Sequence, residues 1–230
     1  MQWLGTFQLF LFDLDGLLVN TEEIHYQAYK LMLERRGYKL PWDFMTYFRI
    51  AQSDATAPRR YIYAEFPKLH QEEPDWDVLY REKKSAYLSL LESKQAPLMP
   101  GAEKMLQLLA QHDVKRAVVT HSAKQFVEVL KEKNPILATI PHWFTREDYK
   151  EPKPAPDGYL KAIEQLAEPR DKIIGFEDSS RGLRALLQTR AKGIFVNSID
   201  DEAFTKFTNE GVPTFKTLDD VVDAPASSYC

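Results

Sequence analysis

A buried strand that ends in two acids is the feature that most limits how this chain folds. Four apolar residues in a row, Leu9 to Phe12, suit a strand that is covered on both faces of a sheet. Asp13 and Asp15 follow at once, and Gly16 then lets the chain turn away. Because strand residues two apart point to the same side, both acids are expected at the sheet edge where open α/β folds bind ligands.

Taken alone, the segment Asp13-Leu14-Asp15-Gly16 admits two interpretations. It could be an ordinary turn after a strand, since Asp and Gly are common turn formers. It could equally be an active site, in which paired carboxylates hold Mg²⁺ and perform covalent or acid–base chemistry. A helix–loop–helix calcium site is excluded, because that motif needs an acid or amide where Leu17 stands and a later glycine.

Composition limits the class of protein. The 230 residues are 44% hydrophobic and 28% charged, as is ordinary for a globular protein. The formal net charge of −4 and the lack of a long basic run disfavour nucleic-acid binding. Cys230 is the only cysteine, so no intrachain disulfide can form. The N-terminal segment lacks a signal-peptide pattern, and no apolar stretch reaches the roughly 20 residues that cross a bilayer. A cytoplasmic monomer is expected.

Residues 20–92 show helical spacing and no convincing strand pattern. Asn20 and Glu23 resemble a helix capping pair at the start of the first helix. The helices expected in this tract span about 21–36, 57–66 and 75–91. Its many tyrosine, phenylalanine and tryptophan side chains favour the core of a small helical bundle over an aromatic wall that binds substrate.

From Pro100-Gly101 onward, the pattern alternates between helices and strands. The expected strands cover 116–119, about 140–145, 172–176, 193–196 and a short segment near 214. The expected helices cover 102–111, 124–133, 158–166, 181–189 and 202–207. This alternation predicts an α/β fold with a doubly wound, Rossmann-like parallel sheet. The catalytic core would comprise residues 1–19 and 93–230, with a helical cap domain of residues 20–92 inserted after the first strand.

Polar side chains follow three of the predicted strands, and a fourth connection carries a lysine. They are Asp13 and Asp15, Thr120 and Ser122, Glu177 and Asp178, and Lys153 among Pro152, Pro154 and Pro156. Each has a plain structural alternative: helix capping for the hydroxyls and acids, and a solvated surface position for the lysine. Since the carboxyl ends of parallel strands share one edge, however, these groups can converge into a multi-carboxylate Mg²⁺ site with a phosphate cradle and a counter-charge.

Four motifs together resemble the haloacid dehalogenase-like hydrolase superfamily, in the branch with a helical cap after the first strand. They are Phe12-Asp13-Leu14-Asp15-Gly16, Val119-Thr120-His121-Ser122, Lys153-Pro154-Ala155-Pro156-Asp157 and Gly175-Phe176-Glu177-Asp178-Ser179, in the family's order. The overall pattern is similar to β-phosphoglucomutase-like and phosphoglycolate phosphatase-like proteins. The joint occurrence is far more specific than any single motif.

The resemblance implies a phosphatase that works through an aspartyl-phosphate. Asp13 would be the nucleophile, and Asp15 would protonate the leaving oxygen and then activate water. Lys153 would bridge the nucleophile and the phosphate charge. The implied Mg²⁺ ligands are Asp13, the main-chain carbonyl of Asp15, Glu177 and Asp178. The implied phosphoryl-binding residues are Thr120, His121 and Ser122, although His121 replaces a smaller residue common in relatives and could touch substrate or point to solvent.

The resemblance also bears on the substrate. Thr21 and His25 match positions near the cap hinge, although His25 could equally be an ordinary surface residue of a helix. In the mutase group, a cap loop with a Lys-Gly-x-x-Arg signature grips the sugar phosphate, and Arg49-Ile50-Ala51-Gln52-Ser53 aligns there. Because the glycine and the second cation are absent, a Mg²⁺-dependent phosphatase of a small, sugar-phosphate-like metabolite is favoured over a phosphosugar mutase. Arg49 is the candidate for reading the substrate.

Overall fold

The computed structural model describes residues 3–53, 56–199 and 202–229. The chain divides into two compact units. The core unit contains the residues up to Asn20 and from Pro97 onward, and the helical unit contains Thr21–Ala96. Within the core unit, the leaving and returning segments lie side by side, since the Asn20 N–H donates to the Pro97 carbonyl at 2.8 Å. The helical unit is therefore inserted between the first and second strands.

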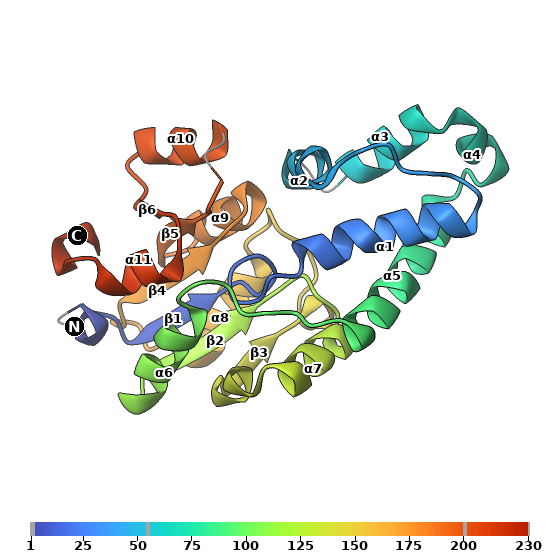
Figure 1. Ribbon diagram of the computed structural model, residues 1–230. Coiled ribbons are helices and arrows are strands. Elements are labelled where there is room, and N and C mark those ends of the chain that lie inside the picture. The colour runs from blue at the N-terminus through green and yellow to red at the C-terminus, as the bar shows by residue number, and fades with distance from the viewer. Residues whose placement is uncertain (1–2, 54–55, 200–201, 230) are drawn as a thin grey trace. The chain divides into compact units, whose positions relative to one another are not determined.

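A six-stranded parallel sheet forms the centre of the core unit, as predicted (Figure 1). Its strands are β1 (Leu9–Phe12), β2 (Lys115–Val119), β3 (His142–Phe144), β4 (Ile173–Glu177), β5 (Lys192–Val196) and β6 (Thr214–Phe215). They run in the order β3-β2-β1-β4-β5-β6. The direction of winding reverses between β1 and β4, which is the point where doubly wound sheets form a ligand crevice. The carboxyl end of β1 lies at that point.

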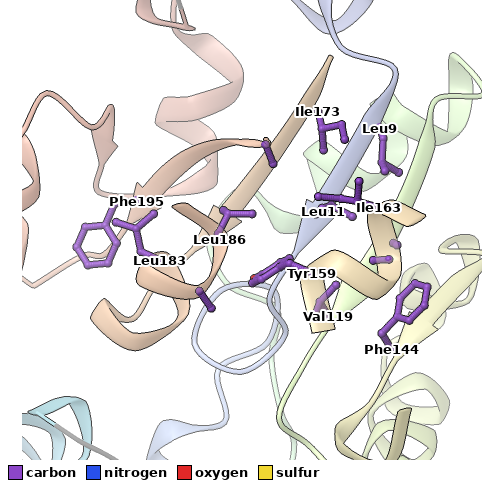
Figure 2. Close-up of a cluster of buried hydrophobic side chains, with 14 of the residues drawn as sticks. Leu9, Leu11, Val119, Phe144, Tyr159, Ile163, Ile173, Leu183, Leu186 and Phe195 are labelled. Carbon is purple, nitrogen blue, oxygen red and sulfur yellow. The ribbon is translucent and has the colours of Figure 1, made fainter. Parts of the chain in front are cut away.

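Strand β1 is buried on both faces of the sheet, which explains why all of its residues are apolar. Leu9 and Leu11 belong to a hydrophobic cluster that also contains side chains of the helices α8 (Asp157–Leu166) and α9 (Ser180–Leu187) (Figure 2). Phe10 and Phe12 lie on the opposite face, where both rings stack on Phe176. All four residues of β1 are fully buried. The strand and the loop that follows it are thereby held rigidly at the centre of the sheet.

Helices join the strands of the core unit in turn. Besides α8 and α9, they are α6 (Ala102–Gln111), α7 (Lys124–Lys133), α10 (Glu202–Asn209) and α11 (Leu218–Asp223). Short 3₁₀ turns cover Leu4–Thr6, Pro135–Thr139, Arg146–Asp148 and Ala226–Tyr229. The predicted helices 102–111 and 124–133 have the bounds observed, and the other predicted elements of this part differ at their ends by one or two residues. Helix α11 was not predicted.

The helical unit comprises five helices among its described residues: α1 (Glu22–Arg35), α2 (Phe44–Ser53), α3 (Ala57–Glu65), α4 (Pro67–Glu72) and α5 (Trp76–Ser93). The two long helices α1 and α5 pack on each other. Most of the aromatic residues form a core with aliphatic ones, as predicted. Two expectations need correction. Helices α2 and α4 were missed, and Thr21, not Asn20, is the residue that precedes the first helical turn, without a side-chain cap bond.

The small and polar residues from 224 onward predict a frayed end, but the described part of this segment packs against the core unit. Tyr229 is buried and stacks on Trp3 with a ring distance of 4.3 Å, and its hydroxyl donates to the carbonyl of Val221. Cys230 lies outside the described residues. Among the helices described, none combines the length and apolarity that a membrane crossing requires.

Candidate active site

Two neighbouring strand ends of the core unit, those of β1 and β4, bring three acidic side chains together. Asp13 follows β1, Glu177 ends β4 and Asp178 comes next, and all three side chains are buried. The backbone N–H of Asp13 donates to the carbonyl of Phe176 at 3.1 Å, which extends the β1–β4 pairing by one residue. The predicted convergence of acids at the carboxyl edge of the sheet is therefore observed for these residues.

Lys153 joins two of the three carboxylates. Its ammonium donates to Asp13 Oδ1 at 2.5 Å, to Glu177 Oε1 at 2.6 Å and to the carbonyl of Val119 at 2.9 Å. These acceptors satisfy the three N–H groups of a lysine. Only 5% of the side chain is exposed, so Lys153 is not the solvated surface lysine considered above. The charge is fixed at the point where β1, β2 and β4 end.

Burial shifts the pKa values of this cluster. Burial raises the pKa of Asp13 to about 7, even though the nearby ammonium of Lys153 opposes the shift. Burial alone would lower the pKa of Lys153, but the carboxylates of Asp13 and Glu177 outweigh it and hold that pKa above its ordinary value. Lys153 therefore stays charged, while an ionised Asp13 needs more positive charge than one lysine supplies.

The cluster fits a hard divalent cation. Asp13, Glu177 and Asp178 each offer a carboxylate oxygen, and these oxygens lie within 4.8 Å of one another. Two glycines leave room for the carboxylates: a Cβ at Gly16 would lie 2.2 Å from Asp178 Oδ2, and one at Gly182 would lie 2.0 Å from Glu177 Oε2. Gly16 also has a φ of +81°, which disfavours other residues. Several buried carboxylate oxygens in one place are the ligand set that Mg²⁺ prefers.

Tyr159 is a member of the site that the sequence did not reveal. Its hydroxyl donates to Glu177 Oε1, the same oxygen that receives the Lys153 ammonium. The pKa of Tyr159 is raised well above its ordinary value because the residue is fully buried beside the carboxylate of Glu177. Oε1 thus has two donors, and Oε2 accepts from the Ser179 hydroxyl at 3.5 Å. Tyr159 thereby orients the carboxylate.

We expect Mg²⁺ to raise the melting temperature of the protein, because a divalent ion offsets the repulsion among three buried carboxylates. At a concentration one hundredfold above its Kd, the stabilisation is about 2.7 kcal/mol, or about 5–10 °C for a chain of this size. Thermal unfolding followed by circular dichroism in EDTA and in MgCl₂ measures it. The Asp178→Asn variant should show a smaller rise, whereas the exposed Asp113→Asn should behave as the wild type. Equal rises in all three proteins would contradict the assignment.

Asp15 has different partners from the three clustered acids. Its Oδ2 accepts hydrogen bonds from Ser122 Oγ at 2.7 Å and from Thr120 Oγ1 at 3.2 Å, and the Ser122 N–H donates to Thr120 Oγ1. Among the described residues, its carboxylate is not part of the metal-binding group. The main-chain carbonyl of Asp15 as a ligand stays a prediction. The two acids of the first motif are thus placed in separate environments, one beside the lysine and one beside the hydroxyls.

His121 is held inside the loop region and does not point to solvent. Its Nε2 lies 2.6 Å from the backbone nitrogen of Lys153 and accepts that N–H. Burial lowers the pKa of His121 to about 3, and the charges of Lys153, Arg181 and Arg146 add to the effect. The ring is therefore neutral at physiological pH. A role of His121 in binding the phosphoryl group stays a prediction.

The remaining predicted site residues belong to the helical unit. Thr21 is fully buried, whereas Arg49 on α2 is exposed. His25 is not a plain surface residue: its Nδ1 lies 2.7 Å from the ammonium of Lys83, and its ring stacks on Tyr87 at 4.1 Å. Lys83 is buried and was not singled out by the sequence, since its partner is 58 positions away. The parts that Thr21, His25 and Arg49 take in binding substrate stay predictions.

Comparison with known proteins agrees with this geometry. A probable pseudouridine-5'-phosphatase of Drosophila melanogaster is 30% identical over 182 residues, covering 76% of this chain and 75% of that protein. The solved structures of CbbY from Rhodobacter sphaeroides with phosphate and of β-phosphoglucomutase from Clostridium difficile share the fold. Their TM-scores are 0.71 and 0.66, both at 22% identity, and they cover 91% and 83% of this chain and 93% and 85% of their own chains. The family model for haloacid dehalogenase-like hydrolases matches residues 10–196. The chain therefore belongs to the haloacid dehalogenase-like hydrolases.

Proposed function

We propose that the protein is a Mg²⁺-dependent phosphatase of a small, sugar-phosphate-like metabolite that works through an aspartyl-phosphate on Asp13. The observation that carries this proposal is the buried Asp13 carboxylate, fixed by the Lys153 ammonium at 2.5 Å inside a group of three carboxylates. A carboxylate that is both aimed and charge-compensated is what nucleophilic attack on a phosphate ester requires.

Charge compensation is the main physical demand of this chemistry. An ionised carboxylate and a phosphate dianion repel each other, and the reaction depends mostly on positioning and electrostatic stabilisation. Lys153 supplies one positive charge at the nucleophile. Mg²⁺ held by Asp13, Glu177 and Asp178 would supply the second and would favour the ionised form of Asp13. Both effects act against the burial that raises the pKa of Asp13.

Asp15 is the proposed proton carrier. In the first step, an oxygen of Asp13 forms a bond to phosphorus, and the ester oxygen departs with a proton from Asp15. In the second step, Asp15 takes a proton from water and the water oxygen attacks phosphorus. The bond between phosphorus and the Asp13 oxygen breaks, which releases inorganic phosphate and restores the Asp13 carboxylate. The hydroxyls of Thr120 and Ser122 donate to Asp15 in this structure, and they are proposed to donate to phosphoryl oxygens when substrate is bound.

The substrate class is proposed from chemistry and from the relatives. One relative is named as a phosphatase of a phosphorylated nucleoside, and CbbY was solved with phosphate. Arg49 in the helical unit adds an exposed cation that could read a hydroxyl-rich or anionic substrate. A mutase would need to hold a bisphosphate through both its phosphates. The segment 49–53, expected as a loop but found at the end of α2, has only one of the two cations of that signature.

Phosphate release from a panel of phosphorylated sugars, nucleotides and polyols tests the proposal. Each compound is incubated with MgCl₂ or EDTA, and inorganic phosphate is measured beside NMR of the organic product. The proposal expects phosphate release that requires Mg²⁺ and yields the dephosphorylated compound. An isomerised phosphate product without net release would instead identify a phosphosugar mutase. No turnover of any compound, with p-nitrophenyl phosphate included, would refute both.

A further inference from the structure

A hydrogen bond ties the loop after β2 to the loop that carries Lys153. His121 lies between Thr120 and Ser122, and its Nε2 accepts the backbone N–H of Lys153 at 2.6 Å. The ring also stacks on Tyr149, whose hydroxyl donates to the carbonyl of Thr120. His121 therefore connects the hydroxyl pair that contacts Asp15 with the lysine that contacts Asp13.

The direction of this hydrogen bond determines the tautomer of His121. A ring nitrogen that accepts a hydrogen bond carries no proton, so a neutral ring must hold its proton on Nδ1. The low pKa of His121 agrees with a neutral ring. Nε2 is thus engaged by the Lys153 backbone, and only Nδ1 could meet a substrate.

The lysine needs such an anchor because its side chain is long. Four rotatable bonds separate the backbone of Lys153 from the ammonium that contacts Asp13, Val119 and Glu177. Its loop is braced further along by Gln188, whose Nε2 donates to the carbonyl of Pro154 at 2.8 Å. At Lys153 itself, the backbone bond to His121 fixes the point from which the side chain starts.

We infer that His121 is a positioning residue that holds the Lys153 backbone, so that the ammonium keeps its place beside Asp13. This inference rests on the proposed phosphatase function for its kinetic consequences. The competing role is direct contact with the phosphoryl group through Nδ1. The two roles use different nitrogens of the same ring, which makes them separable by substitution.

Substitution of His121 by glutamine or by asparagine distinguishes the role of Nε2 from that of Nδ1. The terminal amide of His121→Gln reaches the position of Nε2, whereas that of His121→Asn reaches only the position of Nδ1. Both variants are neutral and polar, so each is the control for the other, and His121→Ala removes both positions. Turnover of p-nitrophenyl phosphate with MgCl₂ gives kcat and KM. Hydrogen exchange of the Lys153 amide is measured by NMR, with the Leu11 amide of β1 as the reference. It reports whether the Lys153 N–H is hydrogen-bonded and does not depend on enzymatic activity.

Loss of the hydrogen bond should lower kcat by about three- to tenfold in His121→Ala and His121→Asn, with KM changed less than about twofold. Protection of the Lys153 amide should fall by a similar factor relative to Leu11. His121→Gln should recover kcat to within about threefold of the wild type and restore the protection. A variant series in which Asn recovers kcat and Gln does not, or in which KM alone changes, would overturn the inference. If the wild type hydrolyses none of the panel, the proposed function fails, while the exchange of the Lys153 amide still decides the positioning role.

Discussion

Asp13→Asn is expected to abolish phosphate release and to leave the protein folded. An amide cannot form the bond to phosphorus, and removal of a nucleophile lowers kcat by more than about 10³-fold. The asparagine carbonyl can still accept a hydrogen bond from the Lys153 ammonium. Burial raises the pKa of Asp13 to about 7, above its ordinary value, so ionisation of this carboxyl lowers the free energy of unfolding as the pH rises above about 4. The melting temperature of the variant at pH 8 in EDTA should therefore match or exceed that of the wild type.

Two measurements complete this test. Acid-quenched protein incubated with a ³²P-labelled substrate should carry label in the wild type and none in Asp13→Asn. Asp113→Asn is the matched control, because Asp113 is an exposed residue of the core unit with a φ of +50° that asparagine tolerates. It should retain turnover and label. Turnover by Asp13→Asn near the wild-type rate would remove Asp13 as the nucleophile.

The central part of the fold could be predicted from the sequence because it follows from local patterns. A short unbroken apolar run that ends in turn-forming residues favours a strand covered on both faces, and β1 is one. In the helix Ala102–Gln111, the apolar residues recur every three or four positions. The predicted bounds of this helix therefore agree with the observed ones. Parallel strands joined by helices leave few topologies, and these bring the ends of β1 and β4 together.

The missed elements have physical reasons. Helix α2 is rich in aromatic residues, so no apolar period stood out, but a signal was present at its start: Asp43 precedes the helix, and its Oδ1 accepts the N–H of Thr46 at 2.7 Å. Helix α11 is only six residues long, but a signal was present: Thr217 and Asp220 form a reciprocal capping box at its start. The buried end of the chain depends on Tyr229 packing against Trp3, a contact across the whole sequence that no local pattern could indicate.

In the candidate site too, some features follow from local sequence patterns and others depend on contacts between distant residues. The acids and the hydroxyls follow strand ends directly and the lysine lies in the connection after β3, so their place at the carboxyl edge of the sheet could be predicted from the sequence. Tyr159 could not, since its ring belongs to the apolar face of α8 and only the hydroxyl reaches Glu177. The contacts of His121 and His25 could not be predicted either, because each depends on a partner 32 or 58 positions away. Side-chain pairing between distant segments is the part that needs coordinates.

Lys153→Met is the second substitution with a large expected effect, since it removes the only positive charge among the described residues that contacts Asp13. Removing one partner of a buried ion pair costs about 3–5 kcal/mol, because the remaining charges stay buried. The kcat should fall by at least about 10²-fold, as the attack on a phosphate dianion loses one of its two compensating charges. Phosphate release and thermal unfolding measure the two effects. Lys150→Met, at an exposed position three residues away, is the control and should change neither.

The pH dependence of this loss separates an electrostatic role from mere packing. In the wild type, the pKa of Lys153 is raised, so its stabilising contribution is fully present below the pKa of an unfolded lysine, across the whole range of pH 5–8. Without the ammonium, which opposes the effect of burial, the pKa of Asp13 should rise further, and ionisation of Asp13 lowers the free energy of unfolding increasingly as the pH rises above about 4. The melting temperatures of wild type and Lys153→Met in EDTA should therefore differ most at pH 8 and least at pH 5, and MgCl₂ should narrow the difference at pH 8. A difference that is the same at both pH values would mean that Lys153 acts through the packing of its side chain and not through its charge.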